Sequence, residues 1–278
     1  MRGCVLPTLA DPYDVLGGLE LYTIGQVNAL PRERRALAYR SLIPLDITLR
    51  FGIDPDTLCD GDGSSLFVIS AGPSSVELSL KHSPSAQDPL LYLQLADTGS
   101  NQIEVVLFVV NDPAGERFDT DRLPDGTRTE FGTAARNIAE EVRAMEAGLA
   151  PGQVRRGLRL TRDLMPILER FIDALHHDAF QIQPLAYHNA ILFERLGFNY
   201  MMGLGRMEWI DRGFARGGLL HGRLDASTPF RQPGAQQTVR GRSWAIHDGI
   251  LGMPYSGIKM YKRVGIHAGI ITFPGAAW

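Results

Sequence analysis

The sequence predicts an α+β fold: an antiparallel sheet from the first half, packed helices in the middle and glycine-rich strands towards the C-terminus. Three observations predict it. Four short apolar segments follow one another between residues 64 and 111. Beyond residue 131 the apolar residues recur with the period of a helix instead of a strand. Beyond residue 200 glycine and proline become frequent, and short apolar segments return.

The four early segments are rich in valine, leucine and isoleucine and are separated by turn-forming residues. They are SLFVIS (65–70), SVELSLK (75–81), PLLYLQLA (89–96) and QIEVVLFVV (102–110). Connections this short leave no room for helical crossovers, so the strands are expected to be antiparallel. QIEVVLFVV is apolar almost throughout, which predicts a strand covered on both faces.

Helices are predicted before and after this sheet. One begins at Pro31, in PRERRALAYR. Another is capped by Thr133 and stopped by Gly148, with apolar residues at three- and four-residue spacing between them. Pro151 opens a further helix, whose apolar stripe runs from Val154 to Leu175. We expect the last two helices to pack on the sheet.

The remaining elements follow from shorter patterns. AFQIQPL (179–185) is expected to be a strand, and the helix through NAILFERL (189–196) is expected to end at Gly197. The late strands are predicted at RSWAIHD (242–248), IKMYKRV (258–264) and HAGIITF (267–273). The 278 residues are expected to form a single α+β domain, and a subdivision would fall in the polar stretch 111–131.

Composition excludes some classes of function. The net charge of −3 supplies no excess of positive charge for a nucleic-acid binder that neutralises phosphates along a duplex. The longest apolar run, Val105–Val110, is far shorter than the roughly 20 residues of a membrane helix. The acidic N-terminal stretch does not resemble a secretory signal, so a cytoplasmic protein without membrane partners is predicted. A small-molecule substrate is expected, and a homo-oligomer is compatible with the sequence.

The most suggestive stretch for chemistry is PGQVRRGLR, residues 151–159. A basic turn with a glycine at the start of a helix suits a pyrophosphate, because the first N–H groups of a helix lack partners and carry partial positive charge. Arg155 and Arg156 would add charged hydrogen bonds, Gly157 would let the backbone approach closely, and Leu158 would contribute its amide.

Further along, the helix in AILFERLGF (190–198) follows the predicted strand AFQIQPL. In order and spacing, residues 150–200 resemble the GNAT superfamily of acyl-CoA-dependent N-acyltransferases, whose phosphate loop typically reads like RRGLG and whose later helix ends like LYEKLGF. The resemblance implies acyl-CoA as cosubstrate and an amine as acceptor. The chain departs from the family at Arg159, where a second small residue is usual, and at Phe193, where the family has a tyrosine that often protonates the thiolate. The residues before the turn also have a helical pattern where the family has a strand.

If the resemblance holds, other residues must take up the proton transfers. Tyr200 or Tyr187 could act as the acid, and His188 or Glu194 could accept the amine proton. His188 and Glu194 are six residues apart, which turns them about 240° from one another on a regular helix.

Two other classes of function remain open. His188, His247 and His267 could bind Zn or Fe together with a carboxylate, although no recognised metal motif surrounds them. His247 and its neighbour Asp248 would point to opposite faces of a strand and would not share a site. The third class is a non-catalytic module that binds a small molecule or a protein.

Overall fold

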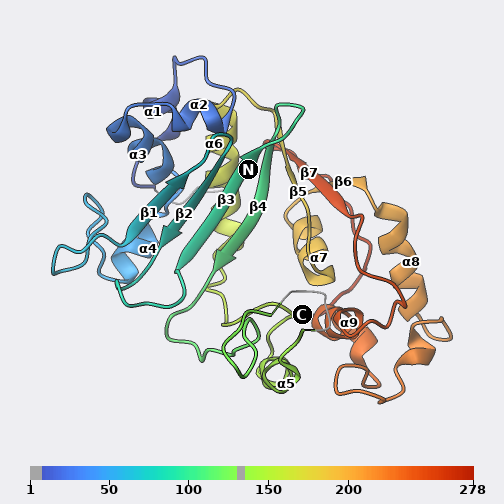
Figure 1. Cartoon of the computed structure of the whole chain (residues 1–278). Helices are drawn as coiled ribbons and strands as arrows, with labels where there is room; N and C mark the ends of the chain where they lie inside the picture. Colours follow the sequence, from blue (N-terminus) through green and yellow to red (C-terminus); the bar gives the residue numbers. More distant parts are fainter. Residues whose placement is uncertain (1–7, 130–134) are drawn as a thin grey trace. The chain divides into compact units, whose positions relative to one another are not determined.

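The computed structural model describes residues 8–129 and 135–278, and the fold is α+β, as predicted. Its strands form a seven-stranded sheet in the order β1-β2-β3-β4-β5-β7-β6 within the described residues (Figure 1). The strands are β1 Phe67–Ala71, β2 Ser75–Leu80, β3 Leu91–Asp97, β4 Ile103–Val110, β5 Ala179–Ile182, β6 Asn199–Met202 and β7 Lys259–Arg263. The α-helices are α1 Pro12–Leu16, α2 Ile24–Asn28, α3 Arg32–Arg40, α4 Leu45–Arg50, α5 Ile138–Glu146, α6 Thr161–Ala174, α7 Tyr187–Arg195, α8 Leu204–Phe214 and α9 Val239–His247. No helix of the described ranges has the length and apolar character needed to cross a bilayer.

The chain divides into two compact units. Unit 1 contains the chain up to Ala114, together with Gly157–Ile182 and Tyr261–His267. Unit 2 contains Gly115–Arg156, Gln183–Met260 and Ala268–Trp278. The first boundary therefore lies within the 111–131 stretch at which the sequence predicts a subdivision.

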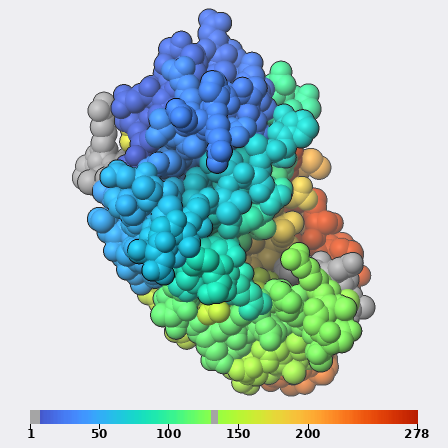
Figure 2. Space-filling model, turned by 60° about the vertical axis from the view of Figure 1, so that its left-hand side comes forward, coloured from blue at the N-terminus to red at the C-terminus, as the bar shows by residue number. Residues whose placement is uncertain are grey.

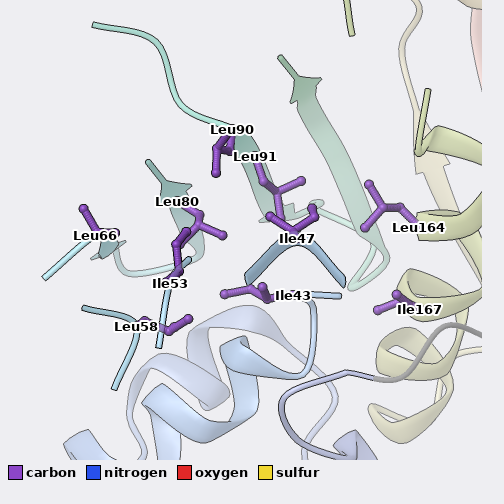
Figure 3. Close-up of a cluster of buried hydrophobic side chains, with 10 residues drawn as sticks. All are labelled: Ile43, Ile47, Ile53, Leu58, Leu66, Leu80, Leu90, Leu91, Leu164 and Ile167. Carbon is purple, nitrogen blue, oxygen red and sulfur yellow. The ribbon is translucent and has the colours of Figure 1, made fainter. Parts of the chain in front are cut away.

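In unit 1 the four predicted hairpin strands are antiparallel, as expected from their short connections. Their side chains alternate, so that Val76, Leu78 and Leu80 of β2 are buried while Glu77 between them is exposed. Leucines of β2 and β3 meet Ile43, Ile47 and the α6 residues Leu164 and Ile167 in one apolar cluster (Figure 3). The predicted packing of this helix on the sheet is confirmed.

The N-terminal helices α1, α2 and α4 are too short to have a recognisable apolar period, so the sequence does not predict them. Helices this short are only marginally stable by themselves, so hydrogen bonds at their ends contribute much of their stability. Thr23 and Gln26 form a capping box on α2. The Asp97 carboxylate at the end of β3 accepts hydrogen bonds from the N–H groups of Ile24 (2.7 Å) and Gly25 (2.9 Å), which holds α2 against the sheet. Figure 2 shows these N-terminal residues in blue beside the cyan residues of the first strands.

The helix predicted between Thr133 and Gly148 is present as α5, but it begins at Ile138 and is capped by Asn137. Thr133 lies outside the described residues. In unit 2 this helix contributes Ala144 to a cluster with Phe118, Leu149, Phe230 and Trp244, rather than to the cluster on the sheet. The prediction that α5 packs on the sheet is therefore not supported by its core contacts.

Two late elements differ from the predictions. RSWAIHD lies in helix α9, because Thr238 caps the helix by accepting from the Gly241 N–H (2.9 Å) and Trp244 is buried with its indole N–H on Leu149 O (2.8 Å). Trp244 and Ile246 alternate with other residues as they would in a strand, but packing of the buried side chains in the core stabilises a helix instead. HAGIITF forms no strand. Strands β5 and β7 and helix α7, followed by Gly197 at a φ of +88°, confirm the other predictions.

Candidate functional site

The turn that precedes helix α6 in unit 1 presents a series of unpaired backbone N–H groups. Helix α6 begins at Thr161, and not at Pro151 as predicted, because residues 151–160 are not helical. No N–H group from Gly157 to Arg162 donates a hydrogen bond to another residue in the described part of the chain. The helix also lacks a side-chain cap. Consecutive free amides at a helix start are typical of anion sites.

Gly157 lies against the end of strand β4. A Cβ atom at this position would lie 2.9 Å from the carbonyl oxygen of Val110, which is closer than a Cβ contact allows. Glycine is therefore required by this close approach. It also means that the turn begins where β4 ends, although 46 residues of sequence separate Val110 from Gly157 by their numbers.

Two arginines of the turn have free guanidinium groups. Arg159 and Arg162 are exposed, and neither forms an ion pair or hydrogen bond with another described residue. Arg159 has a φ of +62°, a left-handed conformation that a branched or long side chain rarely adopts. This is the position at which the GNAT family has a second small residue. Asp163 adds a carboxylate to the first turn of the helix, so one negative charge accompanies the positive charges of Arg159 and Arg162.

The residues predicted to bind the cofactor differ in their contacts. Arg155 donates to Gly115 O (2.5 Å) and Arg156 to Ala147 O (2.8 Å), so both guanidinium groups also hold the backbone of unit 2. The Leu158 side chain is buried. Gly157 occupies the turn as expected. Sequence reasoning missed Arg159 and Arg162 as the free cations, and only their place around a helix start could have indicated them.

Strand β4 loses its partner on one edge halfway along its length. Strand β5 pairs with β4 in parallel, but only at Glu104 and Val105. From Val106 to Val110 no registered pairing with β5 remains. The strand predicted at AFQIQPL thus has β4 as a parallel neighbour, and it pairs with only the first part of β4.

Hydrogen-bond parity identifies which backbone groups face this open edge. The Asn111 N–H donates to Leu90 O (3.0 Å) just beyond the β3–β4 ladder, so the register places residues 111 and 90 at a position of the hydrogen-bonded pairs, although the Leu90 N–H itself donates to Leu80 O (2.7 Å). Because such pairs alternate along antiparallel strands, the peptide groups of Phe108 and Val110 point away from β3. They therefore lie along the edge that β5 leaves open.

A β-bulge marks the point where the pairing with β5 ends. The register passes from Gln94 opposite Leu107 to Leu95 opposite Val105, which leaves Val106 without a partner on β3. Val106 is 41% exposed and Leu107 is 38% exposed. The prediction that this strand is covered on both faces is wrong here, because these two successive side chains, which point to opposite faces, are both exposed.

The predicted proton-transfer residues lie in unit 2. The Glu194 carboxylate, 2% exposed, accepts hydrogen bonds from the Tyr200 hydroxyl (2.5 Å) and from the Thr272 hydroxyl (2.6 Å) and N–H (2.9 Å). Burial raises the pKa of Glu194 above its ordinary value, and these hydrogen bonds offset only part of the increase. The fold thus brings Glu194 and Tyr200 together, and the Tyr200 hydroxyl donates a hydrogen bond to the Glu194 carboxylate.

His188 has different surroundings, as the helical spacing from Glu194 predicts. Its Nδ1 lies 2.9 Å from the Ser243 hydroxyl, and its side chain is buried. Burial lowers the pKa of His188 to about 3, with smaller effects from the charges of Arg240 and His247. A general base must reach its substrate, and His188, Glu194 and Tyr200 contact protein groups in this conformation. Their catalytic roles stay predictions.

His247 and Asp248 do share a cluster, contrary to the prediction from a strand. His247 is the last residue of α9, and its Nε2 lies 3.0 Å from the Glu141 carboxylate of α5. Arg136 bonds both Glu141 and Asp248, and Arg231 bonds Asp248 (2.8 Å). This buried ion network was missed because its members are far apart in the sequence.

The histidines of the predicted metal site belong to different units. His188 and His247 lie in unit 2, whereas His267 lies in unit 1. A search of residues 8–129 and 135–278 finds no group of three or more His, Cys, Asp or Glu residues that could hold a metal ion. The Phe193 ring, at the position of the family tyrosine, packs on Phe198 with ring centroids 5.1 Å apart.

Comparisons with known proteins do not identify a relative. No protein-family model, curated protein or solved structure matches the chain.

Proposed function

We propose that this protein is an acyltransferase that moves an acyl group from acyl-CoA to an amine on a small molecule. The observation that carries the proposal is the series of unpaired N–H groups from Gly157 to Arg162 at the start of α6. The diphosphate of CoA needs several donors and positive charge at one place. The free amides of the turn supply the donors. The positive charge comes from the helix start and from the guanidinium groups of Arg159 and Arg162.

The open edge of β4 supports the same ligand. Beyond the diphosphate, the arm of CoA is a flexible chain that contains amide groups. The outward peptide groups of Phe108 and the outward N–H of Val110 can pair with such amides in the way that a strand edge binds an extended peptide. Because Gly157 meets Val110, this edge starts at the turn and leads away from it.

The spatial order also supports the resemblance to the GNAT superfamily. In the sequence, a helical segment precedes the RRG turn where the family has a strand. In the fold, β4 ends against Gly157, and residues 111–156 intervene only along the chain. A strand therefore leads to the turn in space, which removes one of the departures from the family pattern.

The chemistry requires an electrophilic thioester carbonyl at the open edge. The amine nitrogen attacks this carbon, the C–N bond forms and the C–S bond breaks, the amine loses a proton and the CoA thiolate gains one. A backbone N–H that stands outside the ladder can stabilise the oxyanion that develops. Val106, the extra residue of the bulge, lies at the end of the open edge that is farthest from the turn.

Charge reversal at Arg162 tests the phosphate site. We expect Arg162→Glu to weaken binding of acetyl-CoA by about tenfold or more, because it replaces an attractive charge at the helix start by a repulsive one. Isothermal titration calorimetry with acetyl-CoA, and with CoA alone, measures the effect. The matched control is Arg34→Glu, an exposed arginine on α3 with the same change in net charge.

Two results would count against this function. One is the absence of heat on titrating the wild-type protein with acetyl-CoA and with a long-chain acyl-CoA. The other is an equal loss of affinity in the Arg162 and Arg34 variants, because that would make the effect one of net charge only.

A milder substitution tests the neighbouring arginine. Arg156→Ala is expected to weaken acetyl-CoA binding more than it lowers the midpoint of thermal unfolding, because Arg156 is exposed and its hydrogen bond to Ala147 O contributes only about 1 kcal/mol. Calorimetry and a thermal melt on the same sample measure both quantities. Unchanged affinity would remove Arg156 from the site.

A further inference from the structure

Strand β1 forms one end of the sheet and has a single strand partner, β2. The register is unbroken along the strand, from Phe67 opposite Leu80 to Ala71 opposite Val76. The inner edge of β1 is therefore regularly bonded. Its outer edge faces no strand of the described sheet.

Hydrogen bonds at both ends of β1 fix which residues face outward. At one end the Lys81 N–H donates to Leu66 O (2.9 Å), and at the other the Gly72 N–H donates to Ser75 O (2.8 Å). Val68, Ser70 and Gly72 therefore turn their peptide groups towards β2, as does the Leu66 carbonyl. The Leu66 N–H, which precedes the strand, donates to Leu58 O (2.9 Å) instead.

The alternate residues Phe67, Ile69 and Ala71 turn their peptide groups outward. None of their N–H groups donates a hydrogen bond to another residue of the described ranges. The Phe67 carbonyl accepts only a long hydrogen bond from the Ser65 hydroxyl (3.3 Å). Three donors at the two-residue spacing of a strand match another strand and no compact ligand.

The edge also lacks the features that usually protect an exposed strand. Proteins block such edges with charged residues, prolines or bulges. Between Asp62 and Glu77 the sequence contains no charged residue, and Pro73 comes after the strand. Val68 is 53% exposed on one face of the strand. In Figure 2 the light-blue to cyan part of the chain, which includes β1, forms part of the visible surface.

The pattern is complementary to itself. In an antiparallel pair centred on Ile69, the outward N–H and C=O of each Ile69 bond those of the other, and Phe67 of each copy faces Ala71 of the other. Val68 then lies opposite Ser70, so β-branched and small neutral side chains meet. No like charges come together, because the strand is neutral.

We propose that two copies of this chain associate through antiparallel pairing of their β1 edges about a two-fold axis at Ile69. The partner is a second copy because the same five residues supply every donor, acceptor and neutral contact that the edge requires. Five residues bury less than the roughly 800 Å² per partner of a standard interface. The dimer is therefore reversible and depends on protein concentration. This proposal does not rest on the acyltransferase function.

Sedimentation equilibrium of the full chain tests the proposal. We expect the average mass to rise from 30.6 kDa towards twice that value as the protein is concentrated from about 1 to about 200 μM. Ile69→Pro removes an outward N–H at a position where an edge strand tolerates proline, and Val68→Lys adds an exposed charge to the edge. Both variants are expected to remain monomeric throughout. Val68→Thr, which stays neutral and β-branched, is expected to dimerise like the wild type.

Circular dichroism spectra of all the variants test whether each is folded, which separates a loss of dimer from a loss of structure. A wild-type protein that stays monomeric over the whole concentration range overturns the proposal. So does a dimer that forms equally well in the folded Ile69→Pro and Val68→Lys variants, because another surface would then form it.

Discussion

Replacing Glu141 with glutamine is expected to lower the free energy of unfolding by about 3 kcal/mol at neutral pH. Glu141 is 4% exposed and joins α5 to α9 through His247, with Arg136 as a second partner (Nε to Oε2, 2.9 Å). The neutral amide leaves the half-buried Arg136 guanidinium with Asp248 as its remaining carboxylate, at 3.4 Å. Urea unfolding followed by circular dichroism measures the change.

The pH dependence of this effect has a definite sign. Burial raises the pKa of Glu141, but hydrogen bonds from His247 and Arg136 outweigh that effect and hold the pKa below its ordinary value of 4.5. A lowered pKa means that the carboxylate contributes stability above pH 4.5 and loses it as the pH falls through the folded-state pKa. The difference between wild type and variant should therefore shrink in acid.

Glu116→Gln is the matched control. Glu116 pairs with Arg143 on the surface, where both side chains are more than half exposed. Such pairs contribute about 0 to 1 kcal/mol, so this variant should unfold almost like the wild type. Equal stability losses in the two variants would contradict the role of the buried network.

The free energy of unfolding is also expected to fall by about 1.4 kcal/mol for each pH unit below pH 6.5, as a contribution of His188 alone. The folded protein holds His188 neutral because burial lowers its pKa to about 3 from the ordinary 6.5. Between these two values the unfolded chain binds a proton that the folded chain does not. The stability is therefore complete above pH 6.5 and is lost progressively towards pH 3.

Urea unfolding of the wild type and of His188→Asn at pH 7.5, 6.5 and 5.5 measures this contribution, because asparagine can keep the hydrogen bond to Ser243 without titrating. The two stability curves should run parallel above pH 6.5 and converge below it. Parallel curves across the whole range would show that the folded protein protonates His188 as readily as the unfolded chain does, and would contradict a pKa lowered by burial.

The parts of the fold that the sequence predicts are those specified by local signals. The four hairpin strands follow from short turns and β-branched residues, and α7 ends beside a glycine that adopts a left-handed conformation. The start of α6 was predicted too early because Val154 and Leu158 continue its apolar period. Backbone conformation overrides that period at Arg159, where the positive φ excludes a helix.

The site is predictable only in part, for the same reason. The RRG turn is a local feature, and the sequence indicates it. The open edge of β4 depends on the length of β5 and on a bulge at Val106, which long-range pairing determines. The buried partners of Glu194 and His188 likewise come from Thr272 and Ser243, which no local pattern connects to them.

Backbone hydrogen exchange measured by NMR tests the central claim most directly, because the claim concerns the N–H groups themselves. Without ligand, the amides from Gly157 to Arg162 should exchange rapidly, since they have no acceptor among the described residues. With saturating acetyl-CoA, exchange of these amides should slow by about tenfold or more, while that of the α3 amides stays the same. If the amides of the turn exchange equally fast with and without acetyl-CoA, the diphosphate does not bind there.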